Sequence, residues 1–198
     1  MNTRIVSEVD FLPVSIEEVK KLLRVTPYNL DEDDLLTINI RASVRNLELI
    51  GWQSIIQKTI ELEQQELFEL NKLPSSPLEV SDTRGILEIT SIQYRLNKDS
   101  EYQTLDASQY ELGLNYYTPF VYIKGNVPSI TPHPNAVKIT YNSGYPSPER
   151  VPNSLKLAIM YLAAHFYDNR DLVAPVQLHK LPTALQYMIE PVLLNTLA

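Results

Sequence analysis

The chain has 198 residues, and its 44% hydrophobic content is enough for a sizeable core, which excludes a disordered tail. Its 17 basic and 24 acidic side chains give a net charge of −7, which argues against a nucleic-acid reader, because phosphate binding needs clustered Lys and Arg. The absence of cysteine excludes disulfides, thiolate zinc sites and cysteine nucleophiles.

Two helices are predicted near the N-terminus. Ser15 followed by Glu18 is a capping-box pattern, and apolar residues then recur at helical spacing as far as Arg24. The second helix is predicted to begin in the acidic run 31–34, because negative charge favours a helix N-terminus, and to stop near Gly51. Its apolar stripe is expected to consist of Leu36, Ile40, Val44 and Leu47.

Strands are predicted between Trp52 and Pro148, where the period of the apolar residues changes from 3.6 to 2. We expect five or six short, mostly antiparallel strands, separated by segments rich in turn-forming residues. They are predicted over residues 58–63, 86–95, 110–114, 120–124 and 136–141.

Two further helices are predicted in the C-terminal quarter. Pro152 opens the first of them, because proline suits the first turn of a helix. This helix is apolar on nearly all sides as far as Phe166, so it must be covered on more than one face. Pro182 starts the last helix, whose stripe is Leu185, Met188, Ile189 and Val192.

The predicted fold class is α+β: a small helical bundle made from N- and C-terminal helices, with an inserted antiparallel β domain. We expect N-terminal helices over residues 1–57, a β-rich insertion over 58–148, and C-terminal helices over 149–198 that complete the bundle. The net charge is −3 over residues 1–57, −4 over 58–147 and zero over 148–198, so the C-terminal helices suit burial or contact with a partner.

Motifs for catalysis or cofactor binding are weak in this sequence. His165 and Asp168 stand one helical turn apart, the minimum for a two-ligand metal site, but a third ligand with recognisable spacing is missing. Ser143 precedes Gly144 without the rest of a nucleophile elbow, so we interpret it as a turn residue. The five glycines form no phosphate-binding loop. The sequence therefore predicts no catalytic residue, no metal and no cofactor.

No apolar run approaches the roughly 18 residues of a membrane span, and no signal-peptide pattern opens the chain.

An ordered set of segments resembles one known family. In the C-terminal third these segments are Val151-Pro152, residues 155–159 (LKLAI), residues 163–171 (AAHFYDNRD) and Leu181-Pro182. Before them, in the family's order, come residues 15–24 (SIEEVKKLLR), 31–36 (DEDDLL), 86–94, 105–111 and 137–145 (VKITYNSGY). Over about residues 12–194 the chain resembles the head-tail connector proteins of tailed bacteriophages, also called adaptor or head-completion proteins.

The resemblance implies a structural virion protein and not an enzyme. It implies a ring of twelve subunits beneath the portal, which joins the DNA-filled head to the tail and extends the DNA channel. The implied partners are the portal protein, the next neck or tail-completion protein and further copies of the chain. DNA would pass through without specific binding, and no membrane would be involved. The implied location is the head-tail junction of the virion, after assembly in the host cytoplasm. The alternatives are another neck or tail component, namely a stopper, tail terminator or tubular tail protein, and a small hydrolase that uses His165 and Asp168.

Three sets of candidate site residues follow. The predicted subunit interface is Leu157, Met160, Tyr161, Ala164, Tyr167, Asn169 and Arg170, although the last three could instead only cap and hydrogen-bond within one subunit. The predicted channel-lining carboxylates are Asp31, Glu32, Asp33, Asp34, Glu61 and Glu63, because like charge prevents phosphate binding. The alternative for these carboxylates is an ordinary solvated face. The predicted portal-docking residues are Leu193, Leu194 and Leu197 at the apolar end of the chain.

Overall fold

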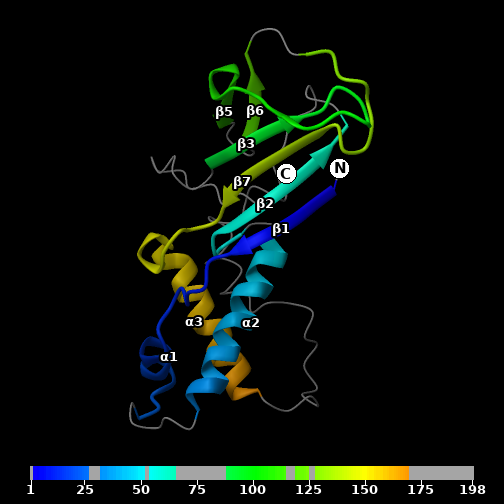
Figure 1. The fold of residues 1–198 in the computed structure, drawn as a ribbon. Coiled ribbons are helices and arrows are strands. Elements are labelled where there is room, and N and C mark those ends of the chain that lie inside the picture. The colour runs from blue at the N-terminus through cyan, green and yellow to red at the C-terminus, as the bar shows by residue number, and fades with distance from the viewer. Residues whose placement is uncertain are drawn as a thin grey trace. The chain divides into compact units, whose positions relative to one another are not determined.

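The computed structural model describes residues 2–26, 32–51, 54–65, 88–114, 119–124 and 128–169 (Figure 1). These residues belong to two compact units. Residues 1–9 and 56–146 form one, called the β unit below, and residues 10–55 and 147–198 form the other, called the helical unit. The predicted α+β class is confirmed. The predicted fourth helix from Pro182 lies outside the described residues.

The β unit contains two antiparallel sheets. The larger has the order β1-β2-β7-β3-β4 and consists of β1 (Asn2–Glu8), β2 (Lys58–Gln64), β7 (Val137–Ser143), β3 (Glu88–Tyr94) and β4 (Gln103–Thr104). The smaller pairs β5 (Tyr110–Leu114) with β6 (Pro119–Ile123). Two short 3₁₀ helices, η1 (Ala107–Gln109) and η2 (Pro148–Arg150), complete the elements outside the α-helices.

Alternation of side chains along the central strands builds the core of the β unit. Ile60 lies opposite Tyr141 and Leu62 opposite Ile139, so these four side chains share one face of the larger sheet and are buried. Val121 of β6 is buried in the same cluster, so the small sheet contributes to this core. The alternation of apolar residues in the sequence of β2 and β7 therefore corresponds to one buried face of the larger sheet.

The chain turns sharply where β7 ends. Gly144 has φ of +106°, and a Cβ atom there would stand 2.4 Å from the carbonyl oxygen of Ile56. Beside it, the Gln57 N–H donates to the Tyr145 carbonyl at 3.0 Å. Only glycine suits this position, because it combines a left-handed backbone with a close approach of another chain segment.

The five predicted strands are present; the bounds of 110–114 are the same, and those of the other four differ by at most two residues at either end. Strands β1 and β4 were not predicted. All seven residues of β1 are exposed, and the strand lies at the edge of the sheet against β2 alone. Its assignment rests on backbone pairing, since it has no alternation of buried and exposed residues that a sequence pattern could reveal.

The helical unit contains α1 (Ile16–Leu23), α2 (Asp33–Gly51) and α3 (Asn153–Asp168). The predicted capping box is present: the Ser15 N–H donates to the Glu18 carboxylate at 2.7 Å, and the Glu18 N–H donates to the Ser15 Oγ at 3.2 Å. Pro152 occupies the N-cap of α3, one position earlier than the first-turn position expected from the sequence.

The predicted stripe of α2 is confirmed, since Leu36, Ile40, Val44 and Leu47 are all buried. They meet buried residues on one side of α3, namely Leu155, Ala158, Ile159, Leu162 and Ala163, and α1 packs on both helices. Among the described residues no helix is long and apolar enough to cross a membrane.

Candidate functional site

The outward side of α3 carries most of the predicted subunit-interface residues. Tyr161 is 43% exposed, and Leu157 and Met160 are half-buried, so the helix presents apolar side chains at its surface. Ala164 is 9% exposed, at the boundary of the core. Because the other side of α3 is already buried within the helical unit, this outward side is available for a second contact.

The last turn of α3 makes contacts within the helical unit. The Tyr167 hydroxyl donates a hydrogen bond to the Glu32 carboxylate, just before α2. The Asn169 N–H donates to the His165 carbonyl oxygen at 3.0 Å, and the Asn169 side-chain amide donates to the same oxygen at 2.8 Å. Tyr167 and Asn169 therefore make the local contacts that the sequence left open as the alternative to an interface role. Arg170 lies outside the described residues.

The weak chemical motifs do not come together as a site. His165 lies at hydrogen-bonding distance from Asn169, 3.2 Å from the ring Nδ1 to the amide nitrogen. In the part of the chain that the structure describes, no three His, Asp or Glu side chains are grouped as metal ligands would be. Ser143 is the last residue of β7 and 0% exposed, so its interpretation as a turn residue was wrong. A serine with no access to solvent is a poor nucleophile candidate.

The acidic residues before and at the start of α2 differ in their surroundings. Asp33 forms an ion pair with Lys20 of α1, and Glu32 accepts the hydrogen bond from Tyr167. Asp34 is exposed, and Asp31 lies outside the described residues. Negative charge here also stabilises the helix, because the first turn of α2 carries the positive end of the helix dipole. Of the three described carboxylates, Asp34 is the one that faces solvent.

The two predicted carboxylates on β2 lie on the polar face of the large sheet. Glu61 has a side chain that is 14% exposed and pairs with Arg4 at 3.0 Å and Lys138 at 3.4 Å. Glu63 is half-buried between Asn2 and Lys138, its register partners on β1 and β7. The two cations therefore offset the charge of Glu61, and the strand register places Glu63 beside the same Lys138.

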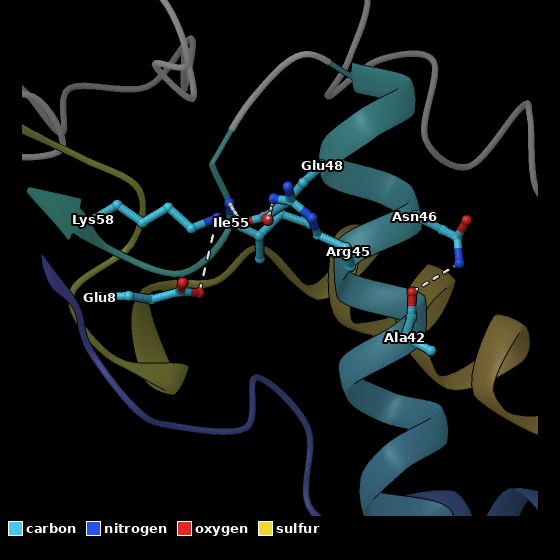
Figure 2. Close-up of polar contacts among 7 residues, drawn as sticks. All are labelled: Glu8, Ala42, Arg45, Asn46, Glu48, Ile55 and Lys58. Carbon is cyan, nitrogen blue, oxygen red and sulfur yellow. Dashed lines mark hydrogen bonds and ion pairs between the residues drawn. The ribbon is translucent and has the colours of Figure 1, made fainter. Parts of the chain in front are cut away.

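A second apolar surface lies on the outward side of α2 and was not predicted as a site. Ile38 is 62% exposed and Leu49 is 60% exposed, and Ala42 and Arg45 lie between them on the same side. Figure 2 shows the polar contacts here: Arg45 reaches Glu48 at 3.3 Å, and Glu48 accepts the Ile55 N–H at 2.9 Å. The signal was present in the sequence, because Ile38 and Leu49 are among the apolar residues of this helix that lie outside its core stripe.

Figure 2 also shows an ion pair between β1 and β2, formed by Glu8 and Lys58. The Lys58 ammonium stands 3.8 Å from the Glu8 carboxylate, and these two residues are register partners on β2 and β1.

The portal-docking candidates Leu193, Leu194 and Leu197 lie outside the described residues.

Solved structures with the same fold come from gene transfer agent (GTA) particles. A chain in the neck of an empty GTA particle, computed with C6 symmetry, is 21% identical with a TM-score of 0.70, and the match covers 96% of this chain and 94% of that one. A chain in the virion of a native GTA particle is 21% identical with a TM-score of 0.72, covering 97% and 95%. A chain in the neck of a native GTA particle, computed with C12 symmetry, is 18% identical with a TM-score of 0.64, covering 93% and 92%.

At these identities the likeness shows the fold alone. The chain has the fold of proteins found in the necks of phage-like particles, as its resemblance to head-tail connectors implied. No protein-family model and no curated protein matches the chain.

Proposed function

We propose that this protein is a structural neck component of a phage-like particle, a ring beneath the portal that joins the DNA-filled head to the tail and extends the DNA channel. The observation that carries the proposal is the likeness to two chains from GTA necks, over 96% and 93% of the sequence, which includes both units and not an isolated domain. The sequence resemblance to head-tail connectors, over about residues 12–194, supports the same proposal. The protein acts at the head-tail junction of the virion, after assembly in the host cytoplasm.

The helical unit supports the ring. Tyr161, Ile38 and Leu49 are open to water on two different helices, and a ring subunit would bury such surface against its neighbours. The outward side of α3, with Leu157, Met160, Tyr161 and Ala164, is one of the two surfaces that each copy contributes.

The acidic side chains keep the channel from holding DNA. Asp34 is exposed on α2 and Glu63 is half-buried on β2, and both repel phosphates within a Debye length of about 10 Å at 0.1 M salt. Glu61 contributes less to this repulsion, because Arg4 and Lys138 offset its charge.

Docking to the portal uses the apolar C-terminal segment, with Leu193, Leu194 and Leu197 as contact residues. The chain is monomeric or weakly associated until the portal presents a ring of equivalent sites, because many weak contacts made together gain avidity. The next neck or tail-completion protein then binds the far side of the ring.

Sedimentation velocity of the purified full chain, alone and with isolated portal rings, tests this proposal. We expect a slowly sedimenting species alone and cosedimentation with the portal rings in the mixture. A variant that lacks residues 195–198 serves as the matched comparison and should lose much of the cosedimentation. Full-length protein that does not cosediment with portal rings at any concentration contradicts the proposed function, and a stable ring without portal contradicts the nucleation step.

A further inference from the structure

Two surface stripes of the helical unit have the same spacing. On α2 the outward stripe is Ile38, Ala42, Arg45 and Leu49, with steps of four, three and four residues. At 100° per residue these side chains fall within about 60° of one another, on the side of the helix opposite the buried stripe. Ile38 at 62% and Leu49 at 60% exposed are the two most exposed large apolar side chains of the described chain. This surface is called the α2 stripe below.

On α3 the outward stripe is Leu157, Tyr161, Ala164 and Asp168, again with steps of four, three and four residues. Tyr161 is 43% exposed, Leu157 is half-buried and Asp168 is exposed, whereas Ala164, at 9% exposed, lies at the boundary of the core. These positions lie opposite the buried side of the helix, which carries Leu155 and Ile159. This surface is called the α3 stripe below.

The two stripes face away from each other within one subunit. The buried sides of α2 and α3 meet in the core of the helical unit, so each stripe lies on the far side of its own helix. Two different surfaces on opposite sides of a subunit allow head-to-tail association, which generates a ring when the rotation closes. A contact between two identical stripes would instead stop at a dimer.

We propose that the α3 stripe of one copy packs antiparallel against the α2 stripe of the next copy in the ring. This inference rests on the proposed function, because it assumes that the chain forms rings. The 4-3-4 spacing is the same in both directions along a helix. The antiparallel register therefore pairs the four positions as follows: Leu157 with Leu49, Tyr161 with Arg45, Ala164 with Ala42 and Asp168 with Ile38 of the neighbour.

Charge and size distinguish this register from the parallel one. In the antiparallel register the Tyr161 ring meets the Arg45 side chain, which favours a cation–π contact, and two alanines face each other, which lets the helices approach closely. The Asp168 carboxylate then comes to Ile38, one helical turn from Arg41 and toward the positive end of the α2 dipole. In the parallel register the Asp168 carboxylate would instead come to Leu49, near the negative end of that dipole, and Arg45 would face Ala164 and not the Tyr161 ring.

Both arginines can make these contacts without disrupting the core. The Arg41 side chain is 57% exposed and its ion pair with Asp10, at 2.9 Å, lies in solvent. The Arg45 side chain is 60% exposed. Exposed ion pairs of this kind contribute little to stability, so the side chains are able to rearrange. One such helix contact is smaller than a standard interface, which agrees with a chain that associates firmly only when the ring closes.

Cysteine cross-linking of the full chain tests the register directly, because the protein has no cysteine of its own. Leu49→Cys protein is mixed with Leu157→Cys protein on portal rings and oxidised, so that a disulfide-linked dimer can form only between copies. The matched control mixes Ile38→Cys protein with Leu157→Cys protein, since Ile38 lies about 16 Å from Leu49 along α2 and represents the parallel register. Arg45→Cys with Tyr161→Cys is a second antiparallel pair at more exposed positions, and sedimentation on portal rings verifies that every variant assembles.

We expect both antiparallel pairs to give at least about tenfold more cross-linked dimer than the control, because a disulfide requires Cα atoms within about 7 Å. A control pair that cross-links in place of the Leu49 and Leu157 pair overturns the antiparallel register. Variants that assemble on portal rings without cross-linking at either antiparallel pair overturn the docking surface but leave the proposed function standing. Wild-type protein that never assembles on portal rings overturns both.

Discussion

Lys20 of α1 and Asp33 of α2 form an ion pair inside the helical unit, where Lys20 is only 3% exposed. The pair ties the short first helix to the start of the second, so α1 is anchored by charge as well as by the buried Val19. It also means that Asp33, although it belongs to the acidic run, has its charge offset by a cation of its own subunit.

Replacing Lys20 with Met should lower the free energy of unfolding by about 1–3 kcal/mol, because it leaves the Asp33 carboxylate without this ammonium partner. The loss is moderated because the Asp33 side chain is 31% exposed and keeps part of its hydration. Urea unfolding of Lys20→Met and of the exposed control Asp34→Asn measures the effect, and the control should stay within about 0.5 kcal/mol of the wild type. Equal stability of the Lys20→Met protein and the wild type would refute a stabilising pair.

Gly144→Ala should destabilise the β unit by roughly 2–4 kcal/mol, since an L-residue is strained in the left-handed region and a Cβ collides with backbone. The collision is with the Ile56 carbonyl oxygen, at 2.4 Å. Thermal unfolding followed by circular dichroism should report a lower Tm. An unchanged Tm would mean that the segment around Ile56 moves aside at no cost.

The capping box of α1 should make stability depend on pH. The hydrogen bond from the Ser15 N–H, with smaller contributions from the Ser15 hydroxyl and from Lys156 and Lys21, lowers the pKa of Glu18. Because the folded-state pKa lies below the unfolded one, this contribution is complete above the unfolded pKa and is lost as the pH falls through the folded pKa. Urea unfolding between pH 7 and pH 3 should therefore show a smaller acid-induced loss for Glu18→Gln than for wild type. Glu17→Gln, in the same turn but outside the capping box, is the control and should follow wild type.

Replacing the proposed channel-lining residues Asp34 and Glu63 with lysine should give a protein that binds DNA, whereas the wild type is proposed not to bind it. Asp34→Lys and Glu63→Lys each change the local charge by two units, and in a ring the change is repeated in every subunit. We expect these variants, assembled on portal rings, to retain double-stranded DNA in a gel shift at 0.1 M salt more than wild-type rings do, with affinity that falls steeply as salt rises. Glu101→Lys makes the same charge change at an exposed residue outside the predicted channel set. If Glu101→Lys binds DNA as well as the other two, the effect reflects net charge and not a channel wall.

The sequence predicted those features that a local pattern determines. The Ser15–Glu18 box, the α2 core stripe and the alternation along β2 and β7 each depend on residues close in the chain, and the structure has all three. The pairing of Arg4 with Glu61 spans 57 positions, and no local pattern records it. Strand β1 escaped prediction for the same reason, because its partner β2 lies far along the chain and neither of its faces is buried.

The candidate site was predicted in part. The apolar outward side of α3 follows from a helix that is apolar all round, and Leu157, Met160 and Tyr161 do reach its surface. The α2 stripe was missed because Ile38 and Leu49 lie outside the core period, which is the feature that makes them candidates for contact with another chain. The local contacts of Tyr167 and Asn169 depend on three-dimensional neighbours that spacing alone does not reveal.

Electron microscopy of purified protein mixed with portal-bearing capsids tests the central claim most directly. The proposed function predicts one added ring of density at the portal vertex, with the cyclic symmetry of the portal, and no added density on capsids that lack a portal. Capsids that keep an unaltered portal vertex at saturating protein would contradict a neck ring beneath the portal.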